Sequence, residues 1–221
     1  DEAFLNFDGL TISDYQDYGI QMKTRVQKWV GIPVCIGFAP TKALAKVANK
    51  IAKKFPERTK SVYSIDSEEK RIKALKWTKI EDVWGIGRKH AKRLQAKNIF
   101  NAYQFTQLSD EWVRKEMAVV GLRLKHELEG KPTLDLESPK NKKMIATTRS
   151  FEKMYTKIED LSERVSTFTA SCSEKLRKQG SHCNMIMVFV QTNYFRKDQP
   201  QYSRNIIINT DFPTNSTIEL N

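Results

Sequence analysis

The sequence predicts a multidomain α+β protein, and three observations along the chain support this. Residues 1–66 alternate short apolar runs with amphipathic segments, which indicates an α/β layer with a crossover connection. Residues 67–130 show helical periodicity with no strand pattern, which predicts an all-helical segment. After a linker at 131–143, rich in proline and charge, residues 144–221 return to mixed strands and helix.

The first block is expected to run strand, helix, strand, helix, strand. Residues 3–7 predict a short apolar strand. Ser13 and Gln16 predict a capping box at the start of a helix that Gly31 ends. Residues 33–39 predict the next strand, because they begin at a proline soon after Gly31 and are mostly apolar.

The next helix is predicted to start at the Thr41 cap and to end at Phe55 and Pro56. Its buried stripe is Leu44, Val47, Ile51 and Phe55. Its opposite face carries lysines at spacings of four, four and three: Lys42, Lys46, Lys50 and Lys53. The positive charges of these lysines repel one another, and an anion along this face would relieve that repulsion. Periodicity alone, however, favours a face that is only solvated.

The last block is predicted to contain strands and one long helix. Residues 145–151, 185–190 and 206–208 read as strands. The apolar stripe of the helix is Leu161, Val165, Phe168, Cys172 and Leu176.

The charge balance indicates a polyanionic partner. The 221 residues include 38 Lys and Arg against 26 Asp and Glu, a formal net charge of +12. Nucleic acid is the commonest such partner, and acidic lipid or a generic basic surface are the alternatives. No apolar run reaches the length of a membrane span. Cys35, Cys172 and Cys183 are odd in number and far apart, which favours reduced thiols in the cytosol over disulfides or a zinc site.

Residues 83–94 predict a helix-hairpin-helix motif. Apolar-x-Gly-apolar-Gly at 83–87 makes a tight hairpin, and the helix after it offers free N–H groups to a phosphate. Four cations surround the same point: Arg88, Lys89, Lys92 and Arg93. Such contacts hold the sugar-phosphate chain without reading sequence. The alternative is an ordinary glycine turn between helices.

Asp1 and Glu2 are adjacent carboxylates at the head of the first predicted strand. Such a pair can hold hard cations such as Mg²⁺, which bridge to phosphate oxygens. Two acidic residues at a chain start are usually only solvated, so the pair alone is a weak signal. Because the sequence does not begin with Met, it is expected to be a processed or engineered piece.

Taken in order, these segments resemble a Y-family, error-prone translesion DNA polymerase. Residues 1–5 resemble the start of its palm motif, Ser-x-Asp-Glu-Ala, without the first two residues. Residues 37–49 resemble the palm segment that follows, and residues 82–88 resemble the thumb hairpin. Trp84 and residues 148–151 are similar to the UmuC branch rather than the DinB branch.

The resemblance implies a partial α/β palm at 1–66, an all-helical thumb at 67–130 and a partial α+β little finger at 144–221. It implies template-directed nucleotide transfer with two Mg²⁺ ions, in DNA damage tolerance and SOS mutagenesis. The roles that it implies are metal binding and catalysis for Asp1 and Glu2, triphosphate binding for Lys46 and Lys53, and DNA phosphate binding through the N–H groups of Gly85, Ile86 and Gly87.

The chain departs from the family pattern at both ends. The first metal-binding Asp, the fingers, the end of the little finger and a clamp-binding peptide are not found. We therefore expect the parent protein to be the polymerase, and this chain alone to bind DNA without catalysis. The implied partners are primer-template DNA, deoxynucleoside triphosphates, a sliding clamp, a UmuD-type subunit and a recombinase filament. The implied location is the bacterial cytoplasm beside the nucleoid, with no membrane.

Two other functions stay open from the residues. The charge and the hairpin alone would also suit a non-catalytic DNA-binding module. A hairpin-containing DNA glycosylase would need an acidic residue after the hairpin, and Asp110 is available.

Overall fold

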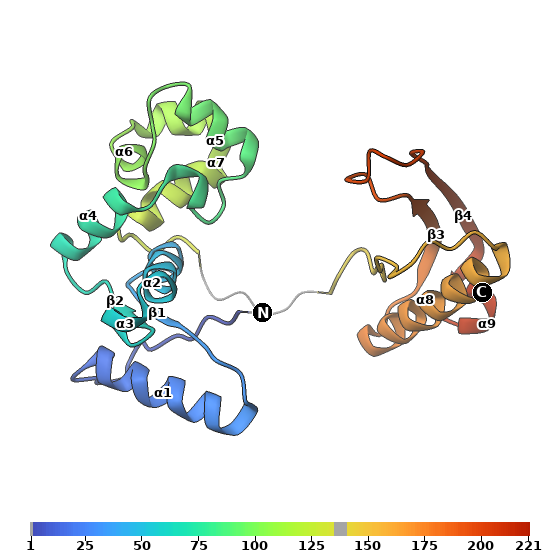
Figure 1. Ribbon diagram of the computed structural model, residues 1–221, viewed down its shortest axis with the longest axis horizontal. Helices are drawn as coiled ribbons and strands as arrows, with labels where there is room; N and C mark the ends of the chain where they lie inside the picture. Colours follow the sequence, from blue (N-terminus) through green and yellow to red (C-terminus); the bar gives the residue numbers. More distant parts are fainter. Residues whose placement is uncertain (1, 135–140) are drawn as a thin grey trace. The chain divides into compact units, whose positions relative to one another are not determined.

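The computed structural model describes residues 2–134 and 141–221, which fall into two compact α+β units (Figure 1). The first unit is Asp1–Glu137 and the second is Ser138–Asn221. No helix in the described ranges is both long and apolar enough to cross a membrane.

Two parallel strands, β1 (Ile36–Phe38) and β2 (Val62–Ser64), form the sheet of the first unit. Between them the chain forms α2 (Lys42–Lys54) and α3 (Pro56–Thr59), so the predicted crossover connection is confirmed. Helix α1 (Tyr15–Val30) precedes β1 and contacts both strands.

Glycine allows β1 and α2 to pack closely. A Cβ atom added at Gly37 would lie 2.2 Å from the backbone nitrogen of Asn49, which no real side chain tolerates. The caps of α2 are as predicted, because the Thr41 hydroxyl accepts from the Leu44 N–H at 3.3 Å and Phe55 ends the helix. The predicted stripe of α2 is also correct, since Leu44 is fully buried and Val47 nearly so.

The predicted capping box of α1 is wrong. Asp14, not Ser13, is the N-cap, and its carboxylate accepts from the N–H groups of Gln16 and Asp17 at 2.7 and 3.1 Å. The helix starts one residue later than expected, so Gln16 is not at the position that reaches back to the cap. Its side chain instead donates to the carbonyl of Thr59 at 2.7 Å.

The predicted strand at residues 3–7 is also wrong, because this segment has no backbone ladder with β1 or β2. It is held by its aromatic side chains. The Phe7 ring lies 5.6 Å from the Phe38 ring, and the Phe4 ring lies 5.7 Å from the Trp84 ring. The apolar run at residues 3–7 therefore indicates side-chain packing and not strand pairing.

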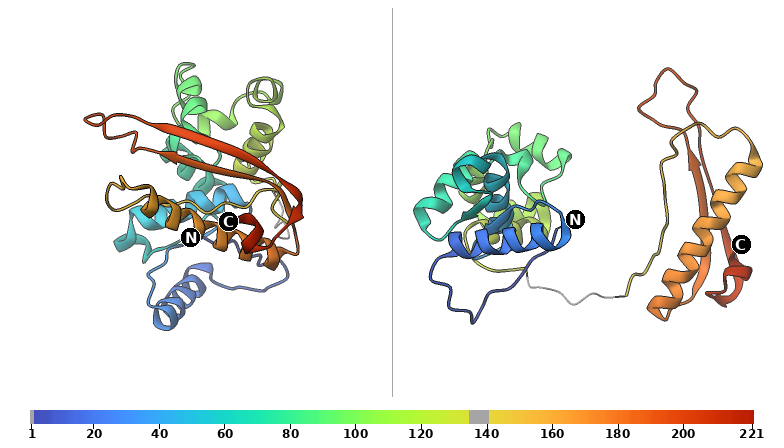
Figure 2. Two further views of the ribbon diagram at one scale, coloured as in Figure 1. Left: turned by 90° about the vertical axis from the view of Figure 1, so that its right-hand side faces the viewer. Right: turned by 60° about the horizontal axis from the view of Figure 1, so that its bottom comes forward.

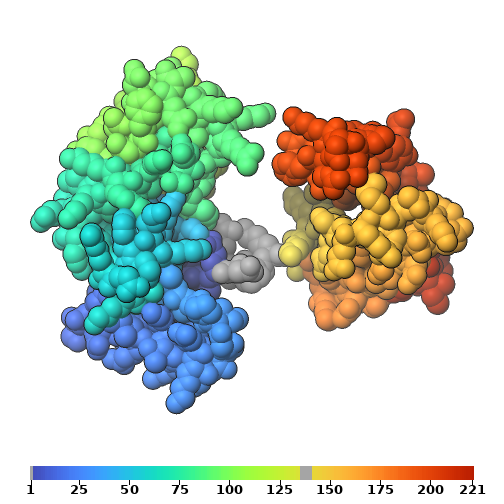
Figure 3. Space-filling view, viewed as in Figure 1, coloured from blue at the N-terminus to red at the C-terminus, as the bar shows by residue number. Residues whose placement is uncertain are grey.

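Helices and turns fill the rest of the first unit. They are α4 (Glu68–Trp77), the 3₁₀ turn η1 (Ile80–Asp82), α5 (Arg88–Gln95), α6 (Ala102–Thr106) and α7 (Asp110–Leu128). One hydrophobic cluster runs from Ala43 in α2 to Leu128 in α7. The α/β part and the helical part thus share a core, and Figure 3 shows them as one continuous body.

Helix α7 is kinked at Ala118, whose φ of 56° and ψ of −165° belong to a region that only glycine normally adopts. The kink folds the helix so that its two ends meet. Lys125 Nζ lies 2.7 Å from the Asp110 carboxylate, and His126 Nε2 lies 3.1 Å from it.

The second unit packs one long helix along a two-stranded antiparallel sheet (Figure 2). Its elements are α8 (Ile158–Gln179), β3 (Cys183–Gln191), β4 (Ser203–Thr214) and the short α9 (Thr217–Leu220). The strands predicted at 185–190 and 206–208 are confirmed, with Met187 opposite Ile207. The predicted stripe forms the less exposed face of α8.

The strand predicted at residues 145–151 is wrong, because it pairs with neither β3 nor β4. It is attached to α8 by side chains instead. Lys175 Nζ donates to the Thr147 hydroxyl at 2.9 Å, and Cys172 Sγ lies 3.3 Å from the same oxygen. This hydroxyl and the Ala146 carbonyl find their partners on a helix, so no ladder is needed to hold the segment.

Part of the predicted linker at 131–143 is bound to the units. The Thr133 hydroxyl donates to the Arg123 carbonyl at 3.0 Å in the first unit. Lys142 exchanges two hydrogen bonds with the Gln179 side chain, at 2.8 and 3.0 Å, in the second.

Candidate functional site

The predicted hairpin is a tight turn between η1 and α5. Gly85 has a φ of +93°, which requires glycine, and both Gly85 and Gly87 are exposed. Ile86 between them is 6 % exposed and belongs to the hydrophobic cluster. The buried isoleucine anchors the turn and leaves the glycine backbone at the surface. The element before the turn is a 3₁₀ turn of three residues, shorter than the α-helix that the motif name implies.

The start of α5 is suited to an anion. Its N-cap, Gly87, offers no side-chain hydrogen bond, and its first turn contains no acidic residue. Arg88 and Lys89 lie there instead, although cations at this end oppose the helix dipole. Free N–H groups, the dipole and two cations therefore all favour negative charge at one point.

The four predicted cations are not equivalent. Arg93 forms an ion pair with Glu116 of α7, and this pair lowers the pKa of the Glu116 carboxyl. Arg88, Lys89 and Lys92 are exposed and have no acidic partner among the described residues. Arg88 and Lys89 are thus available at the start of α5 and Lys92 in its last turn, while Arg93 joins α5 to α7.

The lysine face of α2 is also divided by its contacts. Lys46 forms an ion pair with Glu2, and Lys50 lies 2.7 Å from the Asp82 carboxylate in η1. The Lys42 ammonium lies 5.6 Å from the centre of the Phe4 ring. Lys53 is exposed, with no acidic partner in the part of the chain that the structure describes. Of the two predicted phosphate ligands, Lys53 is therefore open to solvent and Lys46 lies against Glu2.

The structure describes one of the two predicted metal ligands. Asp1 lies outside the described residues, and Glu2 is exposed beside Lys46. No cluster of three or more His, Cys, Asp or Glu side chains suited to a metal occurs in residues 2–134 or 141–221.

A contact that sequence reasoning missed joins the N-terminal segment to the hairpin. The Phe4 and Trp84 rings are 5.7 Å apart and tilted by 43°. This contact joins the N-terminal segment that contains Phe4 to the turn that contains Trp84. The only sequence signal was an aromatic residue inside each motif, and neither spacing nor periodicity connects them.

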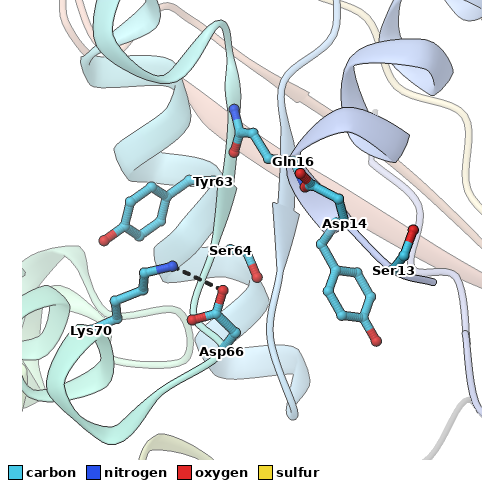
Figure 4. Close-up of a pocket in the computed structure, with 8 residues that line it drawn as sticks. Ser13, Asp14, Gln16, Tyr63, Ser64, Asp66 and Lys70 are labelled. Atoms are coloured by element: carbon cyan, nitrogen blue, oxygen red, sulfur yellow. Dashed lines mark hydrogen bonds and ion pairs between the residues drawn. The ribbon is translucent and has the colours of Figure 1, made fainter.

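A separate pocket of about 290 Å³ lies between the start of α1 and the end of β2 (Figure 4). Its polar lining includes Asp14, Gln16, Tyr63 and Asp66. The Lys70 ammonium lies 2.9 Å from Asp66 and lowers the pKa of that carboxyl. None of the predicted site residues line this pocket.

Asp110, the residue that a glycosylase would need, belongs to an ion cluster. Hydrogen bonds from Lys125 and His126 lower the pKa of its carboxyl to about 2. Lys125 is buried and also binds Glu129 at 2.6 Å. The Asp110 carboxylate therefore pairs with Lys125 and His126 and joins the two ends of α7.

Two models of one protein family match the chain. The model described as the impB/mucB/samB family matches residues 1–50, and its C-terminal domain model matches residues 142–221. Both matches fall in the order that the family resemblance predicts.

Curated relatives match along the chain. Protein UmuC of Salmonella typhimurium (strain LT2) is 33 % identical over 222 residues, covering 100 % of this chain and 53 % of the relative. DNA polymerase IV of Brucella melitensis is 23 % identical over 199 residues, covering 89 % and 43 %. The chain thus spans about half the length of the curated relatives that it matches.

Among solved structures, the insertion ternary complex of Dbh DNA polymerase matches at a TM-score of 0.45 and 18 % identity. The match covers 87 % of this chain and 53 % of that one.

Proposed function

Because this chain belongs to the impB/mucB/samB family and is similar to UmuC along its whole length, we propose that it is part of an error-prone DNA-directed DNA polymerase. Its activity would be template-directed nucleotide addition during translesion synthesis. The observation that carries the proposal is the match of UmuC over all of this chain, at 33 % identity.

In this proposal the hairpin of residues 83–94 holds DNA. A phosphate would lie at the start of α5, against the N–H groups of Gly87 and the residues beside it. Arg88, Lys89 and Lys92 would neutralise neighbouring phosphates, because they have no partners among the described residues. Binding of this kind is insensitive to base sequence and falls steeply with salt.

Nucleotide binding would fall to α2 and the N-terminal residues. Lys53 is open to solvent, so a phosphate could reach its ammonium group. Lys46 forms an ion pair with Glu2, so its ammonium group already binds negative charge at this place. Asp1 and Glu2 would be two of the three carboxylates that hold two Mg²⁺ ions. When bound there, the metal would supply Lewis acidity for the attacking hydroxyl and the leaving group. Lys46 and Lys53 would hold the triphosphate in position for that transfer.

The wider assignments rest on the same family relationship. Residues 1–66 would be part of the palm, 67–130 the thumb and 144–221 part of the little finger, joined through 131–143. The expected partners are primer-template DNA, deoxynucleoside triphosphates, a sliding clamp, a UmuD-type subunit and a recombinase filament. The protein would act in the bacterial cytoplasm at the nucleoid.

Primer extension by the full-length protein tests the proposed reaction. Extension should require a divalent cation and should be abolished by Glu2→Ala. Lys53→Ala should raise the KM for nucleotide about ten- to a hundredfold, because a charge contact to phosphate is worth about 1.5–3 kcal/mol. The neighbouring exposed Lys54→Ala is the control. Base excision without any nucleotide requirement would contradict the proposal.

DNA binding by the chain itself tests the hairpin. A Cβ at Gly87 would meet nothing within 4 Å, so Gly87→Val should fold normally and lose affinity only by blocking a phosphate. Ala96→Val, exposed at the other end of α5, is the matched control. Lys89→Ala should reduce the slope of log affinity against log salt by about 1. If the Gly87→Val and Ala96→Val variants bind DNA with equal affinity, the proposal that this turn binds a DNA phosphate is wrong.

A further inference from the structure

Glu127 of α7 is completely buried, at 0 % exposure, yet carries a carboxylate. Its Oε2 accepts from the Ala43 N–H at 3.2 Å. Its Oε1 accepts from the N–H groups of Thr133 and Leu134 at 2.6 and 3.0 Å, and lies 3.4 Å from the Thr133 hydroxyl. The donors are backbone N–H groups, since the Thr133 hydroxyl donates to the Arg123 carbonyl. No lysine or arginine among the described residues forms an ion pair with Glu127.

The carboxylate lies at the N-terminus of α2. Ala43 is the second residue of that helix, and the Thr41 cap satisfies only the Leu44 N–H with its hydroxyl oxygen. The same hydroxyl donates to the backbone carbonyl of Glu127 at 2.7 Å. A helix N-terminus that follows a strand ordinarily attracts phosphate, through its free N–H groups and its dipole.

We infer that Glu127 is an internal anion that occupies the N-terminal anion site of α2. A carboxylate of the chain stands where a phosphate or other small anion would otherwise bind. The site also recruits the N–H groups of Thr133 and Leu134, so one side chain fixes α2, α7 and the segment after α7 to one another.

Removal of the side chain should leave an empty anion site. Glu127→Ala should lower the melting temperature of the first unit by roughly 5–15 °C, because several buried N–H groups lose their acceptor. Added formate, which matches the lost carboxylate, should recover at least half of this loss with saturation. Formamide, neutral and of similar size, should recover little.

Val113→Ala is the matched control, since Val113 is a fully buried residue of the same helix with no polar role. Formate should not raise its melting temperature beyond the change seen in the wild type. If formate stabilises both variants equally, or neither, the inferred anion site is wrong.

A second variant covers the case in which Glu127→Ala does not fold. Glu127→Gln keeps the shape but turns an NH₂ group toward backbone donors. Hydrogen exchange at the amides of Ala43, Thr133 and Leu134 should then be at least about tenfold faster, with the Ala91 amide of α5 unchanged. Unchanged exchange at the first three amides would overturn the inference.

One consequence rests on the proposed function and is tested separately. In the folded Glu127→Gln full-length protein, the KM for nucleotide should rise while kcat and DNA affinity stay close to those of the wild type, because Lys46 and Lys53 lie on α2 and the hairpin does not. Failure of this arm with success of the exchange arm would place the fault in the assignment of α2 to nucleotide binding.

Discussion

The first unit surrounds a hydrophobic cluster that runs from Ala43 to Leu128, whereas the second unit buries little beyond Ser173, Leu176, Thr214 and Leu220. The difference arises from how the elements cover one another. In the first unit α2 packs against strands and helices at once, and each helix of residues 67–130 contributes side chains to the same core.

Within residues 141–221, one long helix, α8, lies along the sheet of the second unit (Figure 2). Met185, Met187 and Phe189 on one face of β3 are 46–58 % exposed. On the opposite face of the sheet, Ile206 and Ile208 of β4 are 58 and 49 % exposed. Since stability follows the apolar area removed from water, the second unit should be the weaker of the two. The comparison teaches that secondary structure can be regular where burial is slight.

Truncating the core of the first unit should have the largest effect. Phe105 is completely buried, so Phe105→Ala should cost about 3–5 kcal/mol. Calorimetry of the chain should show this loss in the more stable transition, with the less stable one unmoved. A single transition that shifts as a whole would show that the units do not unfold independently.

Truncation in the second unit should cost less and should depend on position. Leu176 is 8 % exposed and Ile208 is 49 % exposed. Leu176→Ala should cost about 2 kcal/mol, at the low end for a buried leucine, and Ile208→Ala about 1 kcal/mol or less. Urea unfolding followed by circular dichroism would measure both. Equal costs would mean that β4 is covered in solution.

A substitution at the α7 kink should stabilise the first unit. Ala118 adopts a conformation that costs a non-glycine residue about 1–3 kcal/mol. Ala118→Gly should relieve that strain, for a net gain of about 1 kcal/mol after the greater entropy of glycine in the unfolded chain. Ala170→Gly in the unkinked helix α8 is the control and should destabilise by about 0.5–1 kcal/mol.

Acid should act on the first unit through the cluster at the ends of α7. The pKa of Asp110 is lowered to about 2, and that of Glu129 is lowered because bonds from Lys125 and Lys131 outweigh its burial. Depressed carboxyl pKa values stabilise the fold above about pH 4, and this contribution is lost as pH falls toward 2. In the Asp110→Asn variant, the melting temperature of the first unit should depend less on pH between pH 4 and pH 2. An unchanged pH profile would mean that the ion cluster does not stabilise the fold.

Signals within a few residues were enough to predict α2. Its threonine cap, its apolar spacing and its stop at Phe55 are all local, and all are confirmed. The strands predicted at 3–7 and 145–151 failed because a strand needs a hydrogen-bonding partner that its own sequence does not name. The missed cap of α1 is a smaller error of the same kind, since Ser13 and Asp14 are both suitable caps.

The candidate site was located by local pattern, but its internal contacts were not. Glycine spacing and clustered cations marked the turn before α5. The pairing of Arg93 with Glu116, and of Lys50 with Asp82, joins residues 23 and 32 positions apart, which no periodicity reports. No sequence pattern singled out Glu127, and only the fold shows that it is buried.

The tilted ring contact of Trp84 with Phe4 provides an intrinsic fluorescence signal for the hairpin. Trp84 is part of the hairpin and is 39 % exposed, so its indole emission should respond to anything that binds at the start of α5. Trp29, Trp77 and Trp112 also contribute to the emission, so Trp84→Phe would supply the background spectrum. Occupation of the turn could then be followed in real time, without attaching a dye.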